Sequence, residues 1–170
     1  MYNEIKHIYP GIKDSEFSLQ DDGDGIYIKE WTYSQPQPTV EQIEEVRPVI
    51  LKRQLVTQID DAVASIYLRF TRFESEYELR ESQAQAYKNA GYTGTTPEQV
   101  MAFANPAGMD YESATNLILN QAAQLRTALA QLGVQRMRKY EILNAATAAA
   151  VHAKYTEISA AIKAIGDSLA

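Results

Sequence analysis

Apolar residues recur every three or four positions through residues 39–89, a spacing that predicts a long amphipathic helix. Thr39 and Gln42 have the spacing of a capping box at its start. Pro48 removes one backbone hydrogen bond, so we expect a kink or short break at 46–48. The apolar positions are Ile43, Val46, Ile50, Ile59, Ala62, Ile66, Phe70, Phe73 and Tyr77.

A second apolar stripe predicts a final helix that Asp110 caps and that runs to about Ser168. Between the two long helices, Gly91 is a suitable C-terminal cap and the sequence predicts a short helix over 96–104. The long helices would measure about 60 and 87 Å, too long for either to bury its stripe inside a compact chain of this size. A long antiparallel helical hairpin, with the short helix at its turn, is the simplest solution.

The first 38 residues have a different pattern and predict a small separate module. Residues 16–20 alternate polar and apolar side chains, and residues 26–33 are rich in β-branched and aromatic residues. The Asp-Gly steps of residues 21–25 favour a turn, so we expect a β-hairpin over 16–33. Residues 2–9 predict two helical turns. The predicted fold class is therefore mainly α with a small N-terminal β-hairpin, divided into domains 1–38 and 39–170.

Composition narrows the function classes. The 170 residues include no cysteine and two histidines, which excludes a disulfide framework and a thiolate zinc site. The net charge of −6 argues against nucleic acid as the main partner, and the lack of an apolar run of membrane-spanning length predicts no membrane partner. The first ten residues lack the apolar run of a signal peptide. These features predict a soluble, intracellular or assembly-associated protein.

Candidate chemistry is sparse. The turn at 21–25 resembles a calcium loop, but the required carboxylates are replaced by Gln20 and Trp31 at its first and last positions. The sequence contains no phosphate-binding loop, dinucleotide fingerprint or nucleophile elbow. We therefore expect no enzyme activity, no catalytic residue, no cofactor and no metal.

Aromatic side chains are dense in the N-terminal module, which suggests either a core or a partner surface. A two-stranded hairpin cannot bury both of its faces alone. Even spacing predicts that Tyr27, Trp31 and Tyr33 share one face and that Ile26, Ile28 and Thr32 share the other. Because the isoleucines are the better core candidates, we expect Tyr27, Trp31 and Tyr33 to form the partner-binding face. The aromatic residues are Tyr2, Tyr9, Phe17, Tyr27, Trp31 and Tyr33.

Two parts of the chain resemble phage proteins. Residues 9–10, 19–23, 25–31 and 37–39 resemble the XkdW-like family of small phage and prophage tail proteins. Residues 81–97, which read ESQAQAYKNAGYTGTTP, are similar to a segment of phage tail-fibre assembly proteins, as is the helix containing 117–119 and 125–129. The resemblance supplies no catalytic residues.

This resemblance implies an assembly chaperone that binds a tail-fibre or receptor-binding protein and assists its folding or trimerisation. The alternative it implies is a structural minor tail or fibre-associated component retained in the virion. The expected location is the host cytoplasm during assembly, or the virion tail. An unrelated helical adaptor or an enzyme stays open as a third interpretation. Extra apolar residues beside both stripes predict a homo-oligomer or a complex with the fibre; they include Leu51, Val63, Leu68, Met101, Phe103 and Met137.

Overall fold

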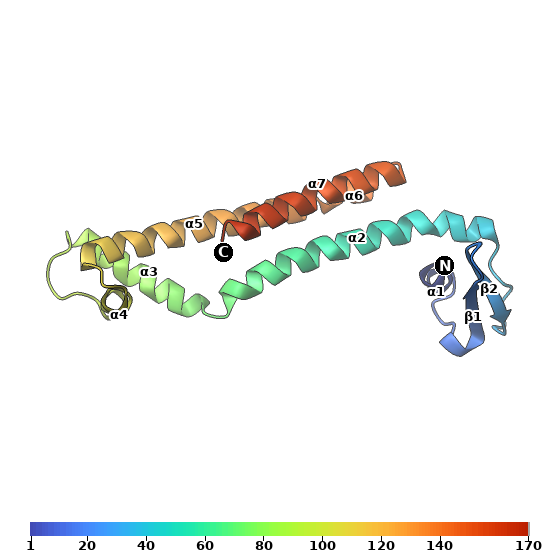
Figure 1. Cartoon of the computed structure of the whole chain (residues 1–170), viewed down its shortest axis with the longest axis horizontal. Coiled ribbons are helices and arrows are strands. Elements are labelled where there is room, and N and C mark those ends of the chain that lie inside the picture. Colours follow the sequence, from blue (N-terminus) through green and yellow to red (C-terminus); the bar gives the residue numbers. More distant parts are fainter. Residues whose placement is uncertain (170) are drawn as a thin grey trace. The chain divides into compact units, whose positions relative to one another are not determined.

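The computed structural model describes residues 1–169 and confirms the expected fold class, helices with one small antiparallel hairpin (Figure 1). Backbone contacts group the chain into two units. The first unit contains Met1–Gln58 and Tyr140–Tyr155, and the second contains Ile59–Lys139 and the described residues from Thr156 onward. The elements in order are α1 (Tyr2–Ile8), a 3-10 turn (Asp14–Glu16), β1 (Phe17–Asp21), β2 (Ile26–Trp31), α2 (Val40–Thr71), α3 (Glu74–Asn89), α4 (Glu98–Ala107), α5 (Tyr111–Met137), α6 (Lys139–Asn144) and α7 (Ala148–Asp167).

The N-terminal module is built around a small apolar cluster between α1 and the hairpin. Ile5, Ile12 and Phe17 are buried at its centre. The chain needs glycine in the hairpin turn, where Gly23 and Gly25 have φ of 104° and 111°. The packed side chains around the buried three are Met1, Tyr9, Leu19, Ile28, Trp31 and Tyr33.

A β-bulge in the hairpin changes which side chains face this cluster. Ser18 pairs with Glu30, but Leu19 pairs with Ile28, so Lys29 has no partner on β1. Such an extra residue shifts the alternation of the strand by one. The expected common face of Tyr27, Trp31 and Tyr33 is therefore wrong, because the bulge lies between Tyr27 and Trp31.

Helix α2 begins with the predicted capping box. The Gln42 amide donates to Thr39 Oγ1 at 3.3 Å, and the Thr39 amide donates to Gln42 Oε1 at 2.9 Å. The helix continues through Pro48, and the interruption comes instead at residues 72–73. Pro48 costs one hydrogen bond, while the buried Ile43 and Ile50 on either side anchor the helix.

The expected single helix from Asp110 to about Ser168 is also wrong beyond Met137. Asp110 does cap α5, since its Oδ1 accepts from the Ser113 amide at 2.7 Å. The chain then forms the short α6, turns at 145–147 and continues as α7 (Figure 1). Thr147 starts α7 because its hydroxyl accepts from the Ala150 amide at 3.2 Å.

Ion pairs show that α7 runs antiparallel to the segment before it. Within the first unit, Lys154 lies 3.1 Å from Glu141. Within the second unit, Arg138 lies 2.5 Å from Glu157. From the first pair to the second, the residue number rises on α7, from 154 to 157, and falls on the preceding segment, from 141 to 138.

The second unit contains the antiparallel helical hairpin that the sequence predicts. Glu81 of α3 pairs with Arg126 of α5, and Lys88 of α3 donates to Asn116 of α5 at 3.1 Å. The short α4 packs at the turn, where Ala84, Val100 and Ile118 form a buried cluster. Helix α4 begins at Glu98 rather than Thr96, with Pro97 in the N-cap position, and extends to Ala107.

Helix α2 contributes to the second unit through its last thirteen residues. Tyr67 donates a hydrogen bond to the Leu129 carbonyl of α5 at 2.7 Å. Gly166 of α7 lies against Ile66, and a Cβ at this glycine would approach Ile66 Cδ1 to 2.9 Å. The absence of a side chain at Gly166 thus permits the close approach of α7 to α2. None of the helices among residues 1–169 is both long and apolar enough to cross a bilayer.

Candidate functional site

The predicted partner-binding residues do not form one surface. Trp31 and Tyr33 pack in the apolar cluster of the module, with ring centroids 6.1 Å apart. Tyr9 packs against both, with its ring centroid 5.7 Å from that of Trp31 and 5.4 Å from that of Tyr33. The Trp31 indole also donates to the Gln35 carbonyl at 2.8 Å. Trp31 and Tyr33 are thus mainly structural.

Tyr27 lies on the other face of the hairpin and is 42% exposed. It is opposite Gln20 in the register, between the Leu19–Ile28 and Asp21–Ile26 pairs. Its hydroxyl donates to Asp22 Oδ2 at 2.6 Å. The hydrogen bond from Gln20, followed by this one from Tyr27, lowers the pKa of the Asp22 carboxyl. The hydrogen bond holds the exposed ring in place, which leaves an ordered aromatic side chain on an acidic surface.

A groove in the second unit is a site that the sequence analysis missed. It has a volume of about 880 Å³ and is lined by residues of α2, α3, α5 and the end of the described chain. Its apolar lining includes Phe70, Tyr77, Ile118, Leu125 and Leu169. Gln121, Gln124 and Gln131 add amide groups. These residues are up to about a hundred positions apart in sequence, so no local pattern could have revealed the groove.

Arg80 is the charged residue of the groove lining. Its guanidinium pairs with Glu76 and lies 5.9 Å from the ring centroids of both Tyr77 and Phe103. Its Nε is buried without a hydrogen-bond partner in the part of the chain that the structure describes. The groove therefore combines apolar walls with one cation and several amides, a composition suited to a peptide segment rather than to acid–base chemistry.

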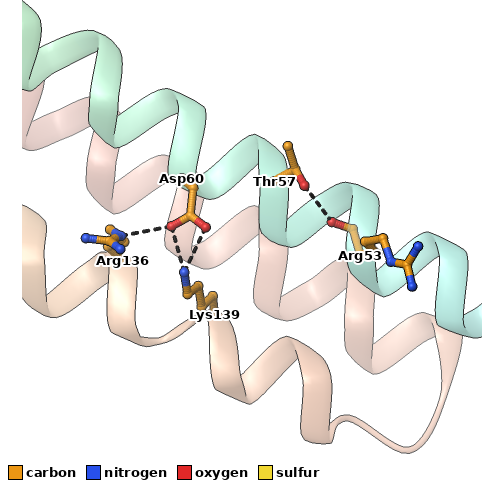
Figure 2. Close-up of polar contacts among 5 residues, drawn as sticks. All are labelled: Arg53, Thr57, Asp60, Arg136 and Lys139. Atoms are coloured by element: carbon orange, nitrogen blue, oxygen red, sulfur yellow. Dashed lines mark hydrogen bonds and ion pairs between the residues drawn. The ribbon is translucent and has the colours of Figure 1, made fainter.

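A polar cluster of residues from α2, α5 and α6 is a second feature of the same unit (Figure 2). Asp60 accepts hydrogen bonds from Arg136 Nε at 2.9 Å and from Lys139 Nζ at 2.7 and 2.8 Å. The hydrogen bonds from Lys139, supported by Arg136, lower the pKa of the Asp60 carboxyl against the opposing effect of partial burial. No group of three or more His, Cys, Asp or Glu side chains in residues 1–169 is arranged to hold a metal ion. The Asp60 cluster thus joins helices and has no evident catalytic role.

The Asp60 cluster predicts a defined pH dependence. Because the folded-state pKa is lowered, the stabilisation is present above the ordinary carboxyl pKa of about 4 and is lost as the pH falls through the folded value. We expect Asp60→Asn to cost at most about 1 kcal/mol at neutral pH, since the carboxylate is partly exposed. The variant should also lose less stability than the wild type between neutral pH and pH ~3.

Urea denaturation at both pH values measures this difference. Asp61→Asn is the matched control, because Asp61 is exposed and has no ion pair within residues 1–169. Equal pH profiles for Asp60→Asn and Asp61→Asn would show that the cluster does not stabilise the fold.

Comparisons with known proteins point to a bacteriophage. Residues 1–53 match the family model described as XkdW protein. A protein of Haemophilus phage HP1 (strain HP1c1), described as an uncharacterized 23.3 kDa protein in the lys 3′ region, is 50% identical over 102 residues. This alignment covers 60% of the chain and 50% of the relative, so the chain spans about half the length of the curated relative it matches. No solved structure matches the chain.

Residues 1–53 are thus similar to the XkdW family, and the chain is similar to a phage protein. These matches concern the resemblance to the XkdW-like family that the sequence analysis describes. The similarity of residues 81–97 and the following helix to tail-fibre assembly proteins stays a prediction.

Proposed function

We propose that this protein is a tail-fibre assembly chaperone, which binds the fibre or receptor-binding protein of its phage and assists folding or trimerisation. The observation that carries the proposal is the match of residues 1–53 to the XkdW model, together with the phage origin of the 50% identical relative. The similarity of residues 81–97 to assembly proteins supports the chaperone role in particular.

The same match favours a second candidate, a structural minor tail or fibre-associated component that stays in the particle. The two functions differ in whether the protein is present in the mature phage particle. Mass spectrometry of purified particles separates them, because stoichiometric copies favour the structural component. Co-expression with the tail-fibre protein of the same phage tests the chaperone, which should increase the yield of soluble, trimeric fibre.

The exposed face of the hairpin is the surface proposed to contact the fibre. It presents Tyr27 beside the carboxylates of Asp22 and Glu30. Residues 1–38 carry three lysines and seven acidic residues, so their net charge is −4. A basic, partly apolar segment of the fibre would complement this surface, and salt should weaken the complex.

Tyr27→Ala should weaken capture of the fibre about tenfold or more without changing thermal stability. Truncation of an interface tyrosine that contributes strongly costs ~2 kcal/mol, whereas the ring contributes little to the apolar cluster of the module. Pull-down of co-expressed fibre protein and thermal melting provide the two measurements. Tyr27→Phe, which keeps the ring and loses the bond to Asp22, should retain most of the capture.

Tyr111→Ala is the matched control, since Tyr111 is an exposed tyrosine of α5 in the other unit. If Tyr27→Ala and Tyr111→Ala capture the fibre as well as the wild type does, the hairpin face is not the recognition surface. If the wild type captures no fibre at all, the chaperone function itself is excluded.

A further inference from the structure

The segment that joins α2 to α3 has opposite charges in its two halves. Residues 68–79 read LRFTRFESEYEL. The half before position 74 contains Arg69 and Arg72 and no acidic residue, while the half from position 74 contains three glutamates and no basic residue. A leucine stands at each end, and an aromatic residue stands third from each end. Read backwards, the segment repeats the outer leucines and the outer aromatic residues, and Glu78 takes the place of Arg69.

The structure leaves three of the five large apolar side chains of this segment exposed to solvent, while Phe70 and Tyr77 are partly buried. Leu68 is 69% exposed, Phe73 is 47% exposed and Leu79 is 48% exposed. Leu68 and Leu79 belong to α2 and α3, and Phe73 lies at the interruption between them. Three large apolar side chains exposed within twelve residues are typical of an association surface.

The charges of the segment are mostly unpaired within the chain. Arg69 and Arg72 have no carboxylate partner in residues 1–169, and Glu74 and Glu78 have no cationic one. Each arginine instead places its guanidinium 5.4 Å from the ring centroid of the next residue, Phe70 or Phe73. Stacking of this kind restricts the side chain and reduces the entropy lost when it forms an ion pair.

We propose that residues 68–79 form the interface of a homodimer, in which two copies pair antiparallel about a two-fold axis near Phe73. Antiparallel pairing places the basic half of each copy beside the acidic half of the other, and each contact occurs twice. Parallel pairing would place like charges together, which destabilises the complex. The dimer is independent of the proposed function, because this surface and the hairpin face belong to different units.

A second copy fits this surface because the segment is complementary to itself. A partner of one charge sign would match only one half. The segment has only twelve residues and is interrupted at 72–73, so we expect the contact to be smaller than the ~800 Å² per partner of stable complexes. We therefore expect a reversible dimer that forms with rising concentration.

Charge reversal provides the test on the full chain. Arg69→Glu with Arg72→Glu makes both halves acidic, and Glu74→Arg with Glu78→Arg makes both halves basic. By sedimentation velocity over a range of concentrations, each double variant alone should dimerise at least tenfold more weakly than the wild type. An equimolar mixture should recover the dimer, because the acidic halves of one variant then face the basic halves of the other.

Lys29→Glu with Arg53→Glu is the control for the first variant, since it changes the net charge equally at two exposed positions of the other unit. This control should dimerise like the wild type. Circular dichroism checks that the helices are retained, and Leu68→Ser, a single uncharged substitution at an exposed leucine, should weaken the dimer without changing the charges.

A wild type that is monomeric at high concentration would overturn the proposal, as would a mixture that stays monomeric. Fibre capture by the charge-reversal variants should equal that of the wild type. A variant that no longer dimerises but still captures the fibre therefore shows that the two proposals are separate. The chaperone function is tested by fibre capture with the hairpin variants.

Discussion

Replacing Trp31 with alanine should destabilise the N-terminal module by about 3 kcal/mol. The indole contacts both sides of the cluster, since its ring centroid lies 5.7 Å from Tyr9 and 6.3 Å from Phe17. The side chain is half-buried, which places the cost at the low end of the range for core tryptophans. The variant also loses the hydrogen bond to the Gln35 carbonyl, which fastens the chain after β2.

Hydrogen–deuterium exchange measures this loss locally. Amides of α1 and both strands should exchange faster by a factor of a hundred or so, since ~1.4 kcal/mol corresponds to tenfold in a local opening constant. Tyr27→Ala is the control, because the exposed ring contributes little to the cluster. Exchange in Trp31→Ala that matches the wild type would show that Trp31 is a surface residue after all.

Replacing Leu132 with alanine should lower the free energy of unfolding by about 2–5 kcal/mol. Leu132 lies on α5, is fully buried and is among the largest completely enclosed side chains of the chain. Its neighbourhood on α5 is fixed, since Tyr67 of α2 bonds the Leu129 carbonyl one turn earlier. A cavity here cannot collapse easily because the backbone on one side is held by that bond.

Urea denaturation followed by circular dichroism gives the comparison. Val134→Ala is the matched control, since Val134 lies two residues further along the same helix and is 63% exposed. It should change the unfolding free energy by less than about 0.5 kcal/mol. Similar losses of unfolding free energy in the two variants would mean that α5 does not bury the face that carries Leu132.

Elements with local signals were predictable from the sequence. The hairpin follows from alternation and Asp-Gly steps, and the caps at Thr39 and Asp110 follow from residue type and spacing. Each of these signals lies within a few residues, so the physics that produces them is visible in a short window.

The helix ends that the sequence predicted wrongly lie where local and tertiary effects compete. The alanine-rich residues 145–150 favour helix, yet the chain turns there because Thr147 caps a new helix and α7 pairs with the segment before it. Thr147 was the available signal for this turn. The interruption at 72–73 has no comparable signal, whereas Pro48, the strongest breaker in the helix, lies where buried neighbours maintain it.

The candidate surfaces were predictable only in part. Tyr27 was correctly expected on an accessible face, but the bulge at Lys29 moves Trp31 to the core side of the hairpin. Bulges leave no clear trace in a single sequence. The groove needed side chains from α2, α3 and α5 to come together, which only the tertiary structure provides.

The bulge also makes the length of β2 matter more than the identity of the bulged residue. Lys29 is exposed and its side chain has no partner among residues 1–169, so many residue types fit there. Deleting it would restore strict alternation between Ile28 and Trp31 and turn the indole away from Tyr9 and Phe17. During divergence this position should therefore change freely in residue type while alignment gaps are selected against. Such conservation of spacing would not show up when identity is scored position by position.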